Sequence, residues 1–530
     1  MRRHWAFRTK GSAMSCKFFP ARSSRQTAVL ALVLGLGGAA IAQSTDAPVD
    51  APVQMPMEEV EQAYTSGDLE TARNGLLAHA EAGELSAQYR LGFMMANGSG
   101  GPFDPAGAKR WLEEAVKQRH GPAIVLLARV YLSDNPEEDD FARAAELLSM
   151  GVEDDIGEAR FYLAQMLRQG RGIAPDAARA FELMNAAARA DMADAQFALA
   201  QMYARGEGVT QDEAQASRWL FQAAEAGQSD AQMSLYFNYE NGNGFPKDPV
   251  KAREWLEIAV NSGVPLAQRI LGTALLLGEA EDADPARGVG LLAAAAEAGD
   301  AGAQSNLGYA YATGTGVTQD DAKAAEWYQR AADQKLTRAA LVMGDAYILG
   351  RGVEPDIEKA VYYLKIALAG RSDVAAQRLG SLVAAGDLPE AELGKENALM
   401  LVAEAADAGD PDALLWLTES AEAGEIYAYL RLANLYRDGT GVEADPARAA
   451  DYYLMAAKEG YAGAQAQLAD LYAAGAGVDQ DYIEAHKWAN VAAANGHETA
   501  AERRDLFANL MTPEQIAEAQ ARARVYMTKN

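Results

Sequence analysis

Apolar and very small side chains recur along this chain with a period of 36 residues. In each period an apolar residue stands seven positions before a recurring glycine, a glycine or alanine usually follows it, and a tyrosine often stands three positions before the glycine. The apolar residues are Leu91, Leu127, Leu163, Leu199, Leu235, Leu271, Leu307, Met343, Leu379, Leu432 and Leu468. Residues three or four positions apart share one face of an α-helix. The pattern therefore predicts a helix with one buried face that ends near each glycine.

Each period then predicts a turn and a second helix. The glycines are Gly98, Gly170, Gly206, Gly242, Gly278, Gly314, Gly350, Gly386, Gly439 and Gly475, with Asp134 in the place of one. Glycine adopts the left-handed conformation that ends a helix at low cost. An aspartate recurs six positions later, and its carboxylate can accept the free backbone N–H groups that begin a helix. These aspartates are Asp104, Asp140, Asp176, Asp212, Asp248, Asp284, Asp320, Asp356, Asp445 and Asp481.

A bulky side chain thirteen positions after the glycine marks the expected core of the second helix. These residues are Trp111, Leu147, Leu183, Trp219, Trp255, Leu291, Trp327, Tyr363, Leu399, Tyr452 and Trp488. A helix–turn–helix unit that repeats at a fixed period indicates stacked modules that bury their apolar faces against their neighbours. The sequence predicts an all-α solenoid of about 11 to 12 units over residues 58–497, with an irregular stretch at 387–424 where the period slips.

The unit around Gly314 shows the whole pattern. It contains Ala303-Gln304, Leu307-Gly308, Tyr311, Gly314-Thr315-Gly316-Val317, Asp320, Ala324, Trp327 and Ala331-Ala332. On these residues the chain resembles the Sel1-like repeat, a relative of the tetratricopeptide repeat. The resemblance implies a right-handed α-solenoid that acts as an adaptor for protein complexes, in bacteria often in the cell envelope. Tyr236, in a slot for a small residue, and Asp134 depart from the family pattern.

The two ends of the repeat region have different sequence character. Residues 43–57 contain Pro48, Pro52 and Pro56 and are predicted to form a flexible linker. Residues 498–530 are predicted to form C-terminal capping helices. The last of these begins with Thr512-Pro513-Glu514-Gln515, the arrangement of a capping box, and is expected to cover the apolar face of the final repeat.

Residues 1–42 are predicted to be a secretory signal peptide. Seven Arg and Lys residues and no acidic residue precede an apolar run from Ala28 to Ala42, where Ala40 and Ala42 form a small-x-small cleavage pattern. The run of 15 residues is shorter than the ~20 needed to cross a bilayer, which disfavours the alternative of a membrane anchor. Met14 is an alternative start. The mature protein is predicted to begin near Gln43, to be periplasmic or secreted, and to have no stable membrane span.

The charge balance limits the classes of partner. The chain has 75 acidic and 47 basic residues, a net charge of −28, and removal of the basic leader makes the balance more acidic. Nucleic acids and anionic membranes bind clustered Lys and Arg, so this composition argues against both as partners. The single cysteine, Cys16, lies in the leader, so no disulfide is expected in the mature chain. We expect a protein or peptide partner.

No catalytic or metal-binding motif appears in the sequence. His79, His120, His486 and His497 form no pair with the spacing of a helical zinc site. The Gly-x-Gly pairs follow a predicted helix, whereas a dinucleotide-binding loop follows a strand. One aspartate per repeat cannot supply the 6–8 oxygen ligands that calcium takes. The prediction is therefore a protein that is not an enzyme and needs no cofactor or metal.

Three functional hypotheses remain open. The first is an envelope scaffold or adaptor that binds protein or peptide partners on the concave face of the solenoid. The second is a periplasmic regulator of a membrane signalling or export complex. The third is a peptidoglycan-related enzyme or accessory factor, which the missing cysteines and the missing serine–lysine motif disfavour.

Six aromatic residues are candidates for the partner-binding surface. They occupy slots nine and five positions before the glycine, which lie about 130° from the core direction at 100° per residue, and they are Tyr89, Phe93, Phe161, Phe197, Phe237 and Tyr309. One interpretation is that they seal one repeat against the next. The other is that they form an apolar stripe that anchors partners through aromatic contacts.

Overall fold

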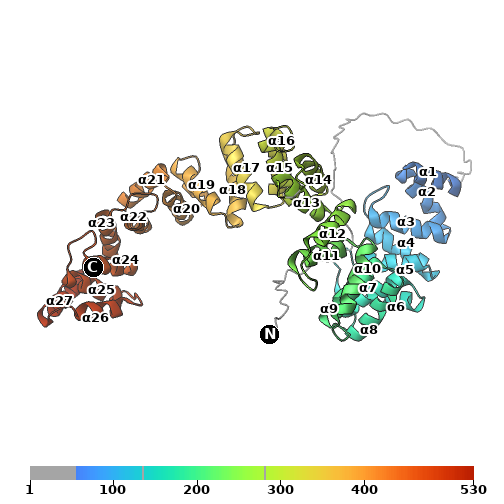
Figure 1. Ribbon diagram of the computed structural model, residues 1–530, viewed down its shortest axis with the longest axis horizontal. Coiled ribbons are helices and arrows are strands. Elements are labelled where there is room, and N and C mark those ends of the chain that lie inside the picture. The colour runs from blue at the N-terminus through green and yellow to red at the C-terminus, as the bar shows by residue number, and fades with distance from the viewer. Residues whose placement is uncertain (1–54, 134–135, 280–281, 530) are drawn as a thin grey trace, which may run out of the picture. The chain divides into compact units, whose positions relative to one another are not determined.

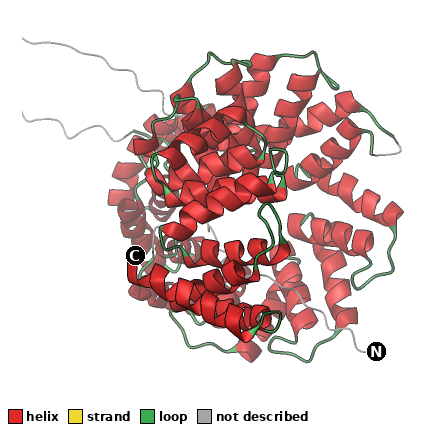
Figure 2. Cartoon of the chain, turned by 90° about the vertical axis from the view of Figure 1, so that its left-hand side faces the viewer, coloured by secondary structure: helices red, strands yellow, loops and turns green. Residues whose placement is uncertain are grey.

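The described part of the chain is entirely helical. The computed structural model describes residues 55–133, 136–279 and 282–529, which form 27 α-helices and one short 3-10 helix and contain no strand (Figures 1 and 2). The predicted all-α class is therefore confirmed. The predicted leader and nearly all of the predicted linker lie outside the described residues, and Met57, the last residue assigned to the linker, begins the first helix.

The chain divides into two compact units, Met1–Ser262 and Gly263–Asn530. The helices of the first unit are α1 Met57–Ser66, α2 Leu69–Glu81, α3 Leu85–Asn97, α4 Pro105–Lys117, α5 Gly121–Tyr131, α6 Glu138–Glu153, α7 Gly157–Gln169, α8 Ala177–Arg189, α9 Ala193–Arg205, α10 Glu213–Glu225, α11 Ser229–Asn241 and α12 Pro249–Asn261. Within this unit, helices that are consecutive in the sequence pack on each other, as in a solenoid.

The second unit continues the pairing of helices. Its helices are α13 Pro265–Leu277, α14 Pro285–Glu297, α15 Ala301–Thr313, α16 Asp321–Asp333, α17 Thr337–Leu349, α18 Ile357–Ala369, α19 Asp373–Ala384, η1 Glu390–Glu392, α20 Lys395–Asp407, α21 Pro411–Glu422, α22 Ile426–Asp438, α23 Pro446–Lys458, α24 Ala462–Ala474, α25 Tyr482–Ala494, α26 Ala500–Ala508 and α27 Pro513–Lys529. In both units the helix before the recurring glycine is the first helix of a repeat, and the helix after it is the second.

The turn within most repeats has the predicted chemistry. The recurring glycines that cap first helices have φ between +65° and +74°. The aspartates that follow accept a backbone N–H of the second helix, as Asp320 does from Lys323 at 3.0 Å. Asp140 is an exception, because α6 begins earlier, at Glu138. Asp140 lies inside the first turn and accepts the backbone N–H of Glu137 at 3.1 Å, so it caps the start of the helix from a different position than the other aspartates.

The second glycine of most Gly-x-Gly turns lies against the preceding repeat. A Cβ atom on Gly208 would lie 1.9 Å from the carbonyl oxygen of Ala177, and one on Gly352 would lie 2.0 Å from that of Asp321. Ala177 and Asp321 are the first residues of second helices α8 and α16. The turn of one repeat therefore packs on the backbone of the repeat before it, with no room for a side chain.

The buried face of the first helix is the predicted one. All of the apolar residues seven positions before the glycine are buried, and Leu307 is 1% exposed. The small residue that follows faces the second helix. A Cβ atom on Gly344 would lie 2.6 Å from a methyl carbon of Leu364, and one on Gly308 would lie 3.0 Å from the ring of Tyr328. The small slot therefore lets the paired helices approach closely.

The second helix has a buried position that the sequence pattern did not predict, directly after the predicted bulky residue. Several of the bulky residues thirteen positions after the glycine are only half-buried, among them Trp219, Trp255 and Trp327. In several repeats the residue directly after them enters the small slot of the first helix, and Leu112, Leu292 and Leu364 are fully buried there. The sequence pattern predicted the bulky residue as the core position, whereas the packing of the two helices depends equally on the residue after it.

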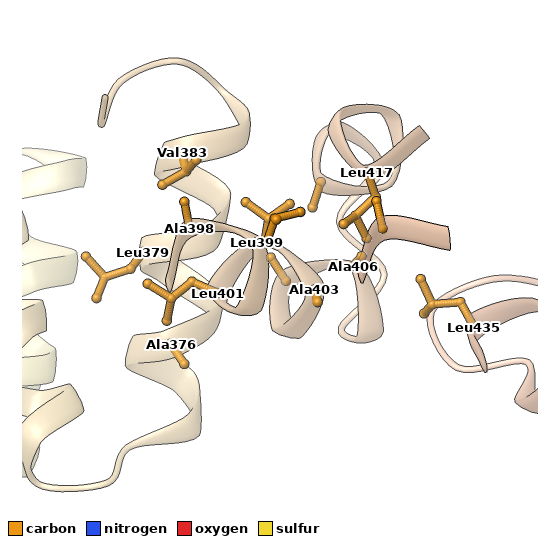
Figure 3. Close-up of a cluster of buried hydrophobic side chains, with 14 of the residues drawn as sticks. Ala376, Leu379, Val383, Ala398, Leu399, Leu401, Ala403, Ala406, Leu417 and Leu435 are labelled. Atoms are coloured by element: carbon orange, nitrogen blue, oxygen red, sulfur yellow. The ribbon is translucent and has the colours of Figure 1, made fainter. Parts of the chain in front are cut away.

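In the irregular stretch, one first helix, α21, is not followed by a second helix. Helix α21 follows α20 where a new repeat would begin, but α22, which begins the next repeat, follows it directly. Leu417 of α21 lies in the same buried cluster as Leu379, Leu399 and Leu435 (Figure 3). The single helix therefore continues the core although half a repeat is missing.

The last helix folds back on the final repeat. The predicted capping box is present, because the N–H of Thr512 donates to Oε1 of Gln515 at 2.8 Å and the N–H of Gln515 donates to Oγ1 of Thr512 at 3.3 Å. Helix α27 packs on α25, where the rings of Trp488 and Tyr526 lie 5.0 Å apart. The Tyr526 hydroxyl donates to the carbonyl oxygen of Ala457 at 3.2 Å.

Buried glutamines join consecutive repeats, a role that the sequence pattern did not reveal. Each donates from Nε2 to the carbonyl oxygen eight residues earlier, at the end of the preceding second helix, over 3.0–3.3 Å; they are Gln88, Gln196, Gln232, Gln304 and Gln465. In three repeats the side-chain oxygen accepts an amide N–H from the residue thirty positions later, namely Gln118, Gln334 or Asn495. The side-chain oxygens of Gln196 and Gln232 have no such donor among the described residues.

Replacing Ala226 by glutamine is expected to stabilise the first unit by about 1 kcal/mol, because it would supply the missing donor to Gln196. Ala226 caps the end of α10 and corresponds to Gln118, which caps the end of α4. Urea denaturation measures the change. The converse substitution, Gln118→Ala, removes the existing donor to Gln88 and should cost a similar free energy. No gain from Ala226→Gln together with no loss from Gln118→Ala would contradict this account.

Candidate functional site

The six candidate aromatic residues fall into three environments. Phe161 is 8% exposed and belongs to the core, so it offers no surface to a partner. Tyr89, Phe197 and Tyr309 are half-buried and pack against core clusters. Phe93 and Phe237 are 40% and 41% exposed. The placement agrees with a sealing role for Phe161 and leaves Phe93 and Phe237 as the members that a partner could contact.

Three of the six rings contact aromatic side chains outside the set. The ring centroids of Tyr89 and His120 lie 4.7 Å apart, those of Phe161 and Tyr162 lie 5.2 Å apart, and those of Tyr236 and Phe237 lie 4.8 Å apart. Tyr236 stands in a slot that a small residue usually occupies. The Tyr236–Phe237 pair therefore forms an aromatic surface on α11 that is partly exposed.

A pocket of about 310 Å³ opens on the first-helix side of the second unit, between α22 and α24. It is lined by Tyr427, Leu430, Arg431, Asn434, Arg437, Tyr453, Tyr461, Gly463, Ala464, Gln467 and His497. Leu430 and Asn434 occupy the slots nine and five positions before Gly439, which are the slots of the aromatic candidates. Sequence reasoning missed the pocket because it followed aromatic residues, which these slots no longer hold in this repeat. The sequence signal that could have indicated the pocket was the presence of Leu430 and Asn434, rather than aromatic residues, in these slots.

Charge pairs surround the pocket. The guanidinium of Arg437 donates from Nε and Nη2 to the two carboxylate oxygens of Asp438, each at 2.7 Å. This pairing lowers the pKa of Asp438 and raises that of Arg437. Burial raises the pKa of the Tyr453 hydroxyl, so this group remains protonated at neutral pH. Arg431 pairs with Asp407.

The histidines take packing positions. His79 is buried and contacts Oε1 of Glu84 at 2.8 Å and the carbonyl oxygen of Met55 at 2.9 Å. His486 is also buried, and Nδ1 of His120 accepts the N–H of Ala123 at 3.3 Å. Over residues 55–133, 136–279 and 282–529, no three His, Cys, Asp or Glu side chains gather as metal ligands would. Within the same ranges no helix has the length and apolar character of a membrane span.

Comparison with known proteins identifies the repeats. The Sel1 repeat model matches residues 85–120, 157–192, 193–228, 230–264, 265–300, 301–336, 337–370, 426–461 and 462–497, together more than half of the chain. The unmatched intervals contain the unit with Asp134 and the irregular stretch. No curated protein sequence matches the chain.

Several solved structures are similar to the chain. The protective antigen c5321 of uropathogenic Escherichia coli, with an SLR fold, is 26% identical over 90% of this chain and 95% of that one, with a TM-score of 0.46. A Sel1 repeat protein from Oxalobacter formigenes is 25% identical over 67% and 88%, with a TM-score of 0.32. A Sel1 repeat protein from Klebsiella pneumoniae is 25% identical over 37% and 95%, with a TM-score of 0.26.

Proposed function

Because the chain belongs to the Sel1 repeat family, we propose that it is a non-enzymatic scaffold of the cell envelope that binds protein or peptide partners on the surface of its first helices. Repeat solenoids present extended surfaces on which partners bind. The envelope location rests on the leader predicted at residues 1–42, and N-terminal sequencing of the exported protein tests it. Recovery of the uncleaved leader on protein in the cytoplasm would contradict that location.

The exposure of Phe93 and Phe237 carries the proposal. Both stand five positions before the recurring glycine, on α3 and α11, and the cores beneath them are filled by Leu91 and Leu235, which are fully buried. An aromatic side chain that the core does not need is available to anchor a partner, because aromatic residues are enriched among the side chains that dominate binding free energy.

The double variant Phe93→Ser, Phe237→Ser tests the surface. We expect it to lose the proteins that the wild-type chain captures from an envelope extract, with a melting temperature within a few degrees of the wild type. Captured proteins are identified by mass spectrometry and confirmed with purified partner. Val250→Ser is the matched control, because Val250 is an exposed apolar residue on the second helix α12. Equal capture by the double variant and the wild type would overturn the assignment of this surface.

A further inference from the structure

The floor of the pocket between α22 and α24 is a chain of oriented hydrogen bonds. Nη1 of Arg437 donates to the Tyr453 hydroxyl at 2.7 Å, and that hydroxyl donates to Oδ1 of Asn434 at 2.5 Å. Arginine can only donate, so the tyrosine oxygen accepts from Arg437, and its own proton is directed to Oδ1 of Asn434. The amide orientation of Asn434 therefore follows from the network, with Oδ1 occupied and the NH₂ group free.

The same reasoning orients Gln467. Nη1 of Arg437 also lies 3.5 Å from Oε1 of Gln467, so the amide oxygen faces the guanidinium. Neither Nδ2 of Asn434 nor Nε2 of Gln467 has a hydrogen-bond partner among the described residues, and Nε of Arg431 and Nδ1 of His497 are buried without one. The amide NH₂ groups of Asn434 and Gln467 are thus the N–H donors that the pocket offers to a ligand, while the two amide oxygens are already taken.

The two arginines that line the pocket add little net positive charge to it. Arg437 is paired with Asp438 and Arg431 with Asp407, so each guanidinium has a carboxylate partner. The whole chain is strongly acidic as well, with a net charge of −28. An anionic ligand would be repelled by the chain as a whole and would find no uncompensated cation in the pocket. Uncharged carbonyl oxygens match the donors without this cost.

The rim of the pocket is apolar and aromatic. Tyr427 and Tyr461 are exposed, and Leu430 is half-buried beside them. Rings and an aliphatic side chain next to N–H donors match a ligand that alternates carbonyl groups with apolar side chains, as an extended peptide does.

We infer that this pocket binds an uncharged, extended peptide segment of a partner, with backbone carbonyl groups on Asn434 and Gln467 and an apolar side chain against Tyr427 and Tyr461. The inference rests on the proposed function and adds to it a site and a ligand chemistry. It lies on different helices from Phe93 and Phe237, so the two surfaces can be tested separately.

The test uses the mature full-length chain and two capped pentapeptides, acetyl-Ala-Ala-Leu-Ala-Ala-amide and its counterpart with glutamate at the centre. Ligand-observed NMR titration measures both dissociation constants. We expect the leucine peptide to bind at least tenfold more tightly than the glutamate peptide.

Two isosteric variants remove the donors and keep the internal hydrogen bonds. Asn434→Asp still accepts from Tyr453, and Gln467→Glu still accepts from Arg437, but each replaces a free NH₂ group by a carboxylate oxygen. Each should weaken binding of the leucine peptide at least tenfold. Asn397→Asp, which adds the same charge at an exposed position on α20, should leave it unchanged.

Three results would overturn the inference: no binding of the leucine peptide, equal or tighter binding of the glutamate peptide, or binding by both donor variants within twofold of the wild type. Thermal melts confirm that the variants fold, and Gln467→Glu serves if Asn434→Asp does not. Failure here, with capture through Phe93 and Phe237 intact, would leave the proposed scaffold function in place.

Discussion

Replacing Gly352 by alanine is expected to destabilise the second unit by about 2–5 kcal/mol, measured by urea denaturation. Gly352 has φ of +71°, and a left-handed conformation costs an L-residue about 1–2 kcal/mol. The new Cβ atom would also lie 2.0 Å from the backbone carbonyl oxygen of Asp321, and forcing atoms into a packed region costs about 1–3 kcal/mol. The backbone of the preceding repeat would have to move to accept the methyl group.

Gly460→Ala is the matched control. Gly460 has φ of +87°, but a Cβ atom there would meet nothing within 4 Å, so only the conformational cost of about 1–2 kcal/mol is expected. The chain itself tolerates side chains at the equivalent turn after other second helices, where Arg119, Asp155, Asp191, Lys335 and Arg371 have positive φ. Equal losses for the two substitutions would show that the close approach contributes nothing.

Leu364→Ala is the second substitution with a large expected effect, a loss of about 2–5 kcal/mol in the free energy of unfolding. Leu364 is fully buried and fills the slot that Gly344 leaves open on the facing helix. Truncation to alanine would leave a cavity between α17 and α18, whose backbones approach closely at Gly344. Thermal and urea unfolding both report the change.

Met400→Ala provides the comparison at the equivalent position of the irregular stretch. Met400 is 48% exposed, whereas its neighbour Leu399 is buried. The expected loss is below about 0.5 kcal/mol, as for surface substitutions away from special features. A loss from Met400→Ala as large as that from Leu364→Ala would mean that the small slot does not determine the cost.

Local chemistry made much of the fold predictable. The left-handed glycines, the aspartate caps and the Thr512–Gln515 capping box each depend on residues within a few positions, so the sequence carried the full information. Leu307 and its equivalents were also predictable, because the helical period places them on one face. Asp140 differs from the other aspartates because α6 begins at Glu138, which places Asp140 inside the first turn.

Contacts between repeats were less predictable. No sequence pattern distinguished Leu364 from Tyr363 as the residue that faces Gly344, because the two are adjacent and both are apolar. The buried glutamines were visible as a motif, but their role depends on a carbonyl oxygen at the end of the preceding helix. For the six aromatic candidates, the period placed them away from the core direction but could not say that Phe161 is buried while Phe93 is exposed.

By itself, the sequence determined that this protein is a series of helix pairs joined by glycine turns and aspartate caps, because those features follow from the conformational preferences of single residues and the period of the helix. Only the tertiary structure decided which side chains of the first helices remain exposed and that Asn434, Tyr453, Arg437 and Gln467 meet in one pocket. Those residues come from three helices, α22, α23 and α24. Their spacing depends on how closely the backbones pack, and no local pattern of residues records that distance.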